Sequence, residues 1–184
     1  MALGVAWDFL KKGLYEEHDG ATPEEVDEQL REGDPFKWQV YRHAAGMAIR
    51  HPKHPSLYLW LRRSPEEDTM HGLWELPGGK VEAHHRDPQH TAEEEVMEEC
   101  GLPVSNVQHW GQHTDDDMQK VYHGFHGDAE HSAVTLPRNP ETGVQEHDKY
   151  LWASPSHMFN SPGRQVSHHA DYLFNQLQST DEGG

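Results

Sequence analysis

The sequence predicts an α/β fold, in which a domain of strands and helices follows a helical N-terminal extension. Apolar runs of strand length recur from residue 36 onward, and a polar run among them, 91–100, has the start and stop signals of a helix. Before residue 36, apolar residues recur at helical spacing instead. We therefore divide the chain into an extension (1–35), a domain (36–179) and a disordered tail (180–184).

The composition is that of a globular protein with polar ends. The chain has 184 residues, and six Trp, six Tyr and five Phe supply large core side chains although the apolar fraction is only 34%. A formal net charge of -17 argues against a general binder of nucleic-acid phosphates. The single cysteine, Cys100, excludes an intrachain disulfide and a cysteine-based zinc site.

No apolar run approaches the ~20 residues of a membrane span, and the N-terminus lacks the pattern of a secretory signal. We therefore expect a cytoplasmic protein. The 17 histidines are unusual. The pairs His84–His85 and His168–His169 suit a transition metal, and scattered surface histidines are the alternative that we favour.

Two helical patterns make up the extension. Apolar residues at helical spacing run through 2–15, and a second helix starts with Thr22 as N-cap, Pro23 at the first position and Glu25 closing a capping box. Such an arm packs on the domain or on a second copy of the chain, as in a homodimer, or it is a loosely attached extension. The sequence leaves these alternatives open.

Strand-like segments then follow at 36–50, 57–61 and 73–76. The run LYLWL at 57–61 is apolar throughout, which is typical of a strand that is buried on both faces. Pro77, Gly78 and Gly79 are expected to stop the third strand and to free the backbone for unusual dihedral angles.

An acidic helix is predicted at 91–100. Thr91 is a plausible N-cap, Glu94 three residues later completes a capping box, and Gly101 stands where a helix C′ glycine belongs. Beyond this helix we expect two strands, a long loop containing a short strand, and a final helix with an apolar stripe, at 104–112, 119–125, 126–142 (short strand 133–136) and 166–177.

Three carboxylates share one face of the acidic helix. Glu95, Glu98 and Glu99 are spaced i, i+3 and i+4, so their charges repel each other. A hard divalent cation such as Mg²⁺ or Mn²⁺ would relieve this repulsion, because such ions prefer carboxylate oxygens. A solvated acidic face is the alternative.

Residues 79–102 resemble the Nudix box, whose pattern is G-x5-E-x7-R-E-U-x-E-E-x-G-U, with U an aliphatic residue. The end of the box is matched by Glu95, Val96, Glu98, Glu99, Gly101 and Leu102, and LPGGKVE at 76–82 is similar to the run that opens it. The resemblance implies an α/β/α sandwich with a mixed sheet. It also implies a hydrolase that uses Mg²⁺ or Mn²⁺ to cleave a nucleoside diphosphate linked to another moiety, X.

The middle of the box departs from the pattern. The arginine position holds Glu94, the first glutamate position holds Arg86, and the loop after Gly79 is one residue longer. In the family these two positions usually form an ion pair that braces the loop against the helix. We predict a charge-swapped brace between Arg86 and Glu94. The alternative is a remodelled loop in which His84, His85 or Asp87 takes the structural role.

The resemblance also assigns site residues. Glu95, Glu98, Glu99 and the carbonyl of Gly79 are the expected metal ligands, and Glu99 or Glu146 is the expected general base, with His147 and Asp148 as rivals of Glu146. The expected contacts to the substrate are Arg62, Arg63, Gly78 and Lys80. A strand at 150–153 would end before Ser154, the hydroxyl residue that starts a helix.

Two further functions remain open at this point. The altered box is compatible with a catalytically weak or inactive domain that binds a nucleotide or a protein partner, and an isoprenoid diphosphate isomerase would keep the same fold. The diphosphate linkage is shared by oxidised nucleoside triphosphates, ADP-ribose, dinucleotide polyphosphates and capped RNA. The small-molecule substrate is therefore predicted only as a nucleotide diphosphate.

Overall fold

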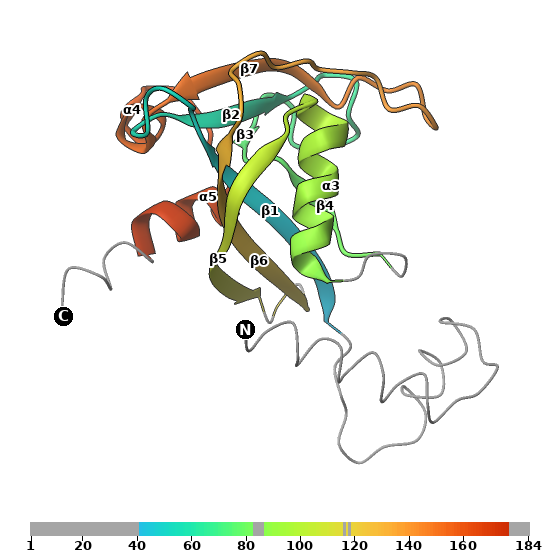
Figure 1. Ribbon diagram of the computed structural model, residues 1–184. Helices are drawn as coiled ribbons and strands as arrows, with labels where there is room; N and C mark the ends of the chain where they lie inside the picture. The colour runs from blue at the N-terminus through green and yellow to red at the C-terminus, as the bar shows by residue number, and fades with distance from the viewer. Residues whose placement is uncertain (1–40, 83–86, 116, 118, 177–184) are drawn as a thin grey trace, which may run out of the picture.

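A computed structural model describes residues 41–82, 87–115, 117 and 119–176. Figure 1 shows these residues as a twisted sheet with helices on both sides. The elements in chain order are β1 (Arg42–Arg50), β2 (Tyr58–Arg63), β3 (Trp74–Glu75), β4 (Gly78–Lys80), α3 (Pro88–Cys100), β5 (Val104–Asp115), β6 (Lys120–Ala129), β7 (His147–Ala153), α4 (Pro155–Asn160), α5 (His168–Asp171) and a π-helical turn, η1 (Tyr172–Gln176).

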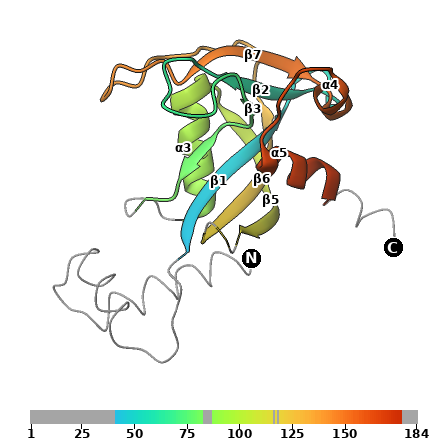
Figure 2. The ribbon, with the colours of Figure 1, turned by 180° about the vertical axis from the view of Figure 1, so that it is seen from behind.

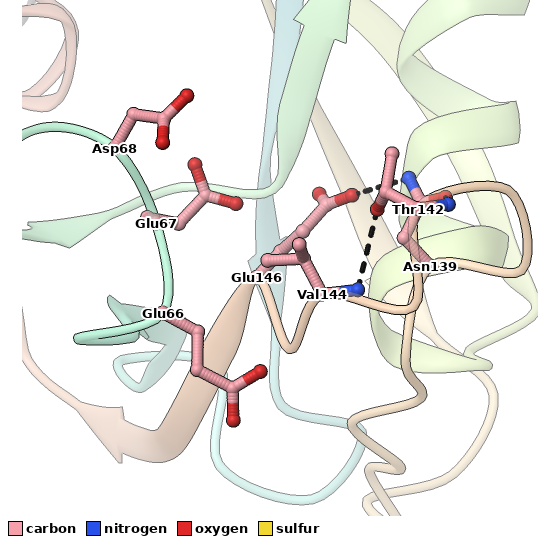
Figure 3. Close-up of a pocket in the computed structure, with 7 residues that line it drawn as sticks. All are labelled: Glu66, Glu67, Asp68, Asn139, Thr142, Val144 and Glu146. Atoms are coloured by element: carbon pink, nitrogen blue, oxygen red, sulfur yellow. Dashed lines mark hydrogen bonds between the residues drawn. The ribbon is translucent and has the colours of Figure 1, made fainter.

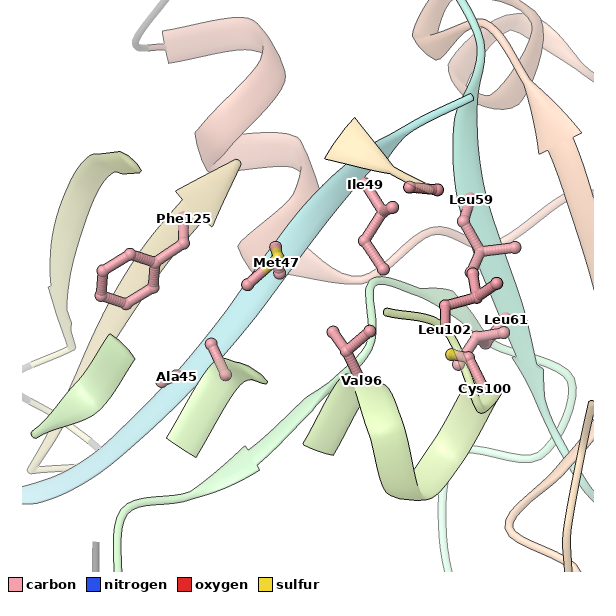
Figure 4. Close-up of a cluster of buried hydrophobic side chains, with 11 residues drawn as sticks. Ala45, Met47, Ile49, Leu59, Leu61, Val96, Cys100, Leu102 and Phe125 are labelled. Carbon is pink, nitrogen blue, oxygen red and sulfur yellow. The ribbon is translucent and has the colours of Figure 1, made fainter. Parts of the chain in front are cut away.

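Strand β1 is the central strand, and alternate residues along it face two separate cores. Ala45, Met47 and Ile49 are fully buried in a cluster with residues of β2, α3 and β6 (Figure 4). Ala44 and Ala48 point the other way, into a second cluster. Small and apolar residues on both faces of β1 follow from this double burial.

The second core lies under the C-terminal segment. Trp60 of β2 is fully buried there beside Leu173 and Phe174, and Met158 of α4 and Ala170 of α5 complete the cluster. Helix α3 and the pair α4–α5 therefore lie on opposite sides of the sheet (Figures 1 and 2). This layering confirms the predicted α/β/α sandwich.

The part of the sheet that the described residues form has seven strands and is mixed. Strand β1 pairs in parallel with β6 along its whole length and antiparallel with β4 on its other edge. Strand β2 pairs antiparallel with β3 and β7. The strands around β1 and the strands around β2 are joined where β1 and β2 pair, at Arg50 and Tyr58, and the two strands diverge from there.

The predicted stop after the third strand is wrong in part. Gly78–Lys80 forms β4, in which Gly78 pairs with Gly46 and Gly79 with Ala45. A Cβ atom at Gly78 would lie 2.3 Å from the carbonyl oxygen of Ala45. Glycine at position 78 therefore allows a close backbone approach to β1, as well as a change of direction.

Helix α3 starts one turn before the predicted start. Asp87 is its N-cap and accepts a hydrogen bond from the backbone N–H of His90 at 2.8 Å, and Pro88 occupies the first turn. Thr91 is therefore inside the helix and is fully buried. An aspartate followed by proline is a stronger start signal than the Thr91–Glu94 pair. The C′ position of Gly101 is confirmed by its left-handed φ of 63°.

Other boundaries differ by several residues. Strands β5, β6 and β7 are longer than predicted. The described residues 133–136 form no strand; Val134 and Leu136 pack against the core from an extended loop. Ser154 caps α4, as predicted. The predicted extension, 1–35, and tail, 180–184, fall outside the described part of the chain. No helix among the described residues is long and apolar enough to cross a membrane.

Candidate active site

Helix α3 holds two of its carboxylates against the glycines of β4. The backbone N–H of Gly78 donates a hydrogen bond of 3.0 Å to Oε2 of Glu99. A Cβ atom at Gly79 would lie 1.9 Å from Oε1 of Glu95, so this carboxylate occupies the space that a side chain at position 79 would need. Glycine at these positions brings the carboxylates of α3 next to backbone atoms of β4.

The electrostatics of this arrangement oppose ionisation. Burial, followed by the charges of Glu98 and Glu146, raises the pKa of Glu95 to about 7. Burial, followed by the charges of Glu95 and Glu75, raises the pKa of Glu99 well above its usual range, although the hydrogen bond from Gly78 acts in the opposite direction. The neighbouring carboxylates, like burial, therefore favour the neutral form of both groups.

A second group of side chains reaches Glu99 from β2, β3 and β7. His147 Nε2 lies 3.0 Å from Oε1 of Glu75, and its Nδ1 lies 3.8 Å from Oε1 of Glu99. Arg63 Nη1 lies 3.2 Å from the same Glu75 oxygen. Glu75 was not among the predicted site residues. It lies in the run LWELPGG, and its charge next to the glycine turn was a signal that could have identified it.

The two predicted phosphate-binding arginines have carboxylate partners in this structure. Arg62 donates to both oxygens of Asp148, which lies across the β2–β7 pair. Arg63 pairs with Glu67, at 2.6 Å, and with Glu75. Of the two, Arg63 is connected to the α3 carboxylates, through Glu75 and His147.

Glu146 lies in a cavity of about 180 Å³ beside β7, between two loops (Figure 3). Its Oε1 accepts a hydrogen bond of 2.6 Å from Asn139, and Figure 3 shows Glu66, Glu67 and Asp68 on the facing loop. Its charge contributes to the raised pKa of both Glu95 and Glu99. The predicted base is therefore electrostatically coupled to the helix carboxylates.

The remaining predicted residues are exposed, cap the helix or lie outside the residues that the structure describes. Glu98 is exposed on α3 and Lys80 is exposed on β4. Arg86, His84 and His85 lie outside the described residues, so the charge-swapped brace to Glu94 stays a prediction. Asp87 has a defined structural role as the N-cap of α3.

The donor set suits a hard divalent cation. Within residues 41–82, 87–115, 117 and 119–176, no three His, Cys, Asp or Glu side chains are already gathered around one position. The α3 face nevertheless offers oxygen donors whose ionised forms are destabilised by burial and by each other. A divalent ion favours those ionised forms, so the residues fit such an ion.

The comparisons with known proteins identify the family of the chain. The sequence model of the NUDIX domain matches residues 40–176, most of the chain. The chain therefore belongs to the Nudix family, whose hydrolases cleave nucleoside diphosphate derivatives and generally use divalent metals. The comparison with curated proteins found no match.

Solved structures show the same fold. A MutT protein from Methanosarcina mazei Go1 is 24% identical, with a TM-score of 0.56 over 77% of this chain and 96% of that one. The NUDIX domain of Shewanella oneidensis NrtR, complexed with ADP ribose, is 13% identical, with a TM-score of 0.58 over 88% and 98%. A C. elegans Ap4A hydrolase is 18% identical, with a TM-score of 0.53 over 77% and 99%.

Proposed function

We propose that this chain is a pyrophosphohydrolase that depends on Mg²⁺ or Mn²⁺ and cleaves the diphosphate linkage of a nucleoside diphosphate derivative or nucleoside triphosphate. The observation that supports this proposal best is the placement of Glu95 and Glu99 against Gly78 and Gly79. Two carboxylates held at a glycine backbone, with raised pKa values, favour cation binding over a merely solvated helix face.

Glu95, Glu98 and Glu99, with the carbonyl of Gly79, would hold the ion. A divalent ion held there would neutralise diphosphate charge and lower the pKa of a bound water. The protein's own part is to fix these oxygens on one helical turn and one strand. Glu99 has the more rigid environment of the carboxylates, because its side chain is only 8% exposed and accepts from Gly78.

Glu99 and Glu146 are the candidate general bases. A base must reach the proton of the attacking water and must be ionised at the working pH. Glu146 lines a cavity and is half-buried, whereas the Glu99 side chain is only 8% exposed, so Glu146 is the more accessible of the two to water. We assign the proton transfer to one of these two groups, and the ligand role to Glu99 in either case.

Substrate phosphates would be bound by Arg62, Arg63, Lys80 and the backbone at Gly78, whose N–H already donates to Glu99. The arginines are already paired with carboxylates, so a phosphate would have to compete with Asp148, Glu67 or Glu75. Lys80 is exposed on β4, immediately after Gly79. We therefore expect Lys80 and Arg63 to contribute to the KM of an anionic substrate.

The compounds to be tested, the substrate panel, are those that contain a diphosphate linkage. The panel contains oxidised and normal nucleoside triphosphates, ADP-ribose, dinucleotide polyphosphates and capped RNA. ADP ribose and Ap4A are named with two of the similar structures, which supports their inclusion. Both products are measured for every compound, with Mg²⁺ and with Mn²⁺.

Glu99→Gln tests the proposal. The variant should lose at least about 100-fold in turnover, and without metal it should keep its melting temperature because a neutral amide replaces a buried carboxylate of similar size. Full activity in Glu99→Gln would remove the α3 carboxylates from the mechanism.

The second candidate is a Nudix domain that binds a nucleotide or partner without hydrolysis. It is favoured by one observation, the glutamate at position 94 where the box usually has arginine. This binding function would be supported, and the hydrolase rejected, if a nucleotide of the panel bound saturably and in a metal-dependent way without forming any product.

A further inference from the structure

His147 is a buried polar residue at the start of β7. Only 4% of its side chain is exposed, and its strand register places it opposite Arg63 of β2. The backbone at this position is also held, because Gln145 Nε2 donates to the carbonyl of His147 at 2.8 Å. A histidine fixed in this way has little freedom to move toward solvent or toward a substrate.

The contacts of His147 form a chain that ends at a proposed metal ligand. Arg63 Nη1 and His147 Nε2 approach the same oxygen of Glu75, at 3.2 and 3.0 Å. The other ring nitrogen, Nδ1, lies 3.8 Å from Oε1 of Glu99. The second oxygen of Glu99 accepts from Gly78. Each oxygen of this carboxylate therefore faces a group from a different strand.

We propose that His147 is a positioning residue: the chain Arg63–Glu75–His147 orients the Glu99 carboxylate for metal binding. This inference rests on the proposed function, because Glu99 must be a ligand for its orientation to matter. A glutamate on a helix has three side-chain torsions to restrict. Contacts to ligand side chains typically change metal affinity or activity by about 10- to 100-fold when they are removed.

The alternative roles of His147 fit the geometry less well. As a metal ligand it would have to free Nδ1 or Nε2 from the two glutamates that it approaches. As a general base it would have to reach a water molecule, but its ring lies between Glu75 and Glu99 and is shielded from solvent. The 3.8 Å approach of Nδ1 to Glu99, which is within ion-pair range when the ring is protonated, fits a group that positions this carboxylate.

The experiment compares the full-length chain with His147→Ala and Glu75→Gln. Mn²⁺ affinity is measured by the electron paramagnetic resonance of free Mn²⁺, and kcat and KM are measured on the best substrate of the panel. We expect His147→Ala to weaken Mn²⁺ binding and to lower kcat by roughly 10- to 100-fold, with a smaller change in KM. Glu75→Gln should act in the same direction. The matched control is His131→Ala, which removes an exposed histidine and should change none of these values.

The double variant tests whether the residues act as one chain. If they do, His147→Ala with Glu75→Gln should lose little more than His147→Ala alone. Full additivity of the two losses would overturn the chain. Wild-type Mn²⁺ affinity and kcat in a folded His147→Ala protein would overturn the proposal itself.

A metal-free measurement separates this inference from the proposed function. The amide proton resonance of Gly78, which reports its hydrogen bond to Glu99, should shift in His147→Ala and stay in place in His131→Ala. An unchanged Gly78 resonance in His147→Ala rejects the positioning role. A wild-type protein that neither binds Mn²⁺ nor hydrolyses the panel rejects the proposed function instead, while the amide resonance still reports whether His147 holds Glu99.

Discussion

Gly78 and Gly79 have different roles, because an added Cβ atom would meet different neighbours at the two positions. A Cβ atom at Gly79 would meet the end of the Glu95 side chain, which can rotate away, so Gly79→Ala should leave the fold intact and displace a proposed ligand. We expect a loss of activity of about 100-fold and a comparable weakening of Mn²⁺ binding, measured by kinetics and by titration.

The neighbouring substitution is the matched control. At Gly78 a Cβ atom would lie 2.3 Å from the carbonyl oxygen of Ala45 and 2.6 Å from Cα of Gly46, both backbone atoms of β1. Gly78→Ala should therefore reduce the free energy of unfolding by about 3 kcal/mol, as measured with urea. Equal losses of stability in the two variants would contradict the distinction.

The raised pKa of Glu95 gives the metal-free protein a defined pH dependence. Its pKa rises from the ordinary 4.5 to about 7, so between these values the folded chain binds more protons than the unfolded chain. Glu95 should therefore contribute a fall in the free energy of unfolding of about 3 kcal/mol as the pH rises through this window. Below pH 4.5 this loss should be absent.

Other groups titrate in the same range, so the free energy of unfolding of the wild type is compared with that of Glu95→Gln, which lacks only this carboxylate. Urea unfolding of both proteins in EDTA, from pH 4 to 8, should give a difference in unfolding free energy that grows with pH and then levels off. A constant difference would show that Glu95 ionises normally.

At the scale of elements, the start of α3 makes a separate prediction. Asp87 caps the helix through the backbone N–H of His90, so Asp87→Ala should lower the free energy of unfolding by about 1 kcal/mol. Asp117→Ala, which removes an exposed aspartate from a turn, is the control and should change it little. Chemical denaturation measures both, and equal effects would argue against the cap.

The sequence predicted elements well where the signal is local. The strand predicted at 57–61 from an apolar run is present as Tyr58–Arg63, and the helix end predicted from a C′ glycine is present at Gly101. The start of α3 was missed because two caps compete, and Asp87–Pro88 prevails over Thr91. Strand β4 was missed because its glycines pair with β1, a partner that local patterns do not specify.

The same limit applies to the site. The proposed helix ligands could be selected from the sequence because their spacing on one helix is fixed by the chain itself. Glu75 was missed, and the place of His147 between two glutamates was not foreseen, because their meeting depends on the registers of β2 with β3 and with β7. The resemblance to the Nudix box supplied the α/β/α layers, which composition and periodicity alone did not.

At the scale of the whole molecule, the repelling carboxylates predict stabilisation by metal. An ion that binds only the folded chain adds about 2.7 kcal/mol to the free energy of unfolding when its concentration is 100 times its Kd. Mg²⁺ or Mn²⁺ should therefore raise the melting temperature of the wild type in a concentration-dependent way. Glu99→Gln should show a much smaller rise. An identical rise in both proteins would mean that the ion binds elsewhere.

The divergence of β1 and β2 has a mechanical consequence. These strands pair at Arg50 and Tyr58, and the proposed ligand Glu99 contacts β4 on the β1 side, whereas His147 belongs to the β2 side. Strand β2 extends about 17 Å from Tyr58 to Arg63. The point at which it pairs with β1 therefore lies far from the carboxylates. A change in the twist between β1 and β2 would therefore alter the distance between Glu99 and His147. The proposed contacts to a diphosphate would thus depend on the twist between two strands as well as on the loops around the site.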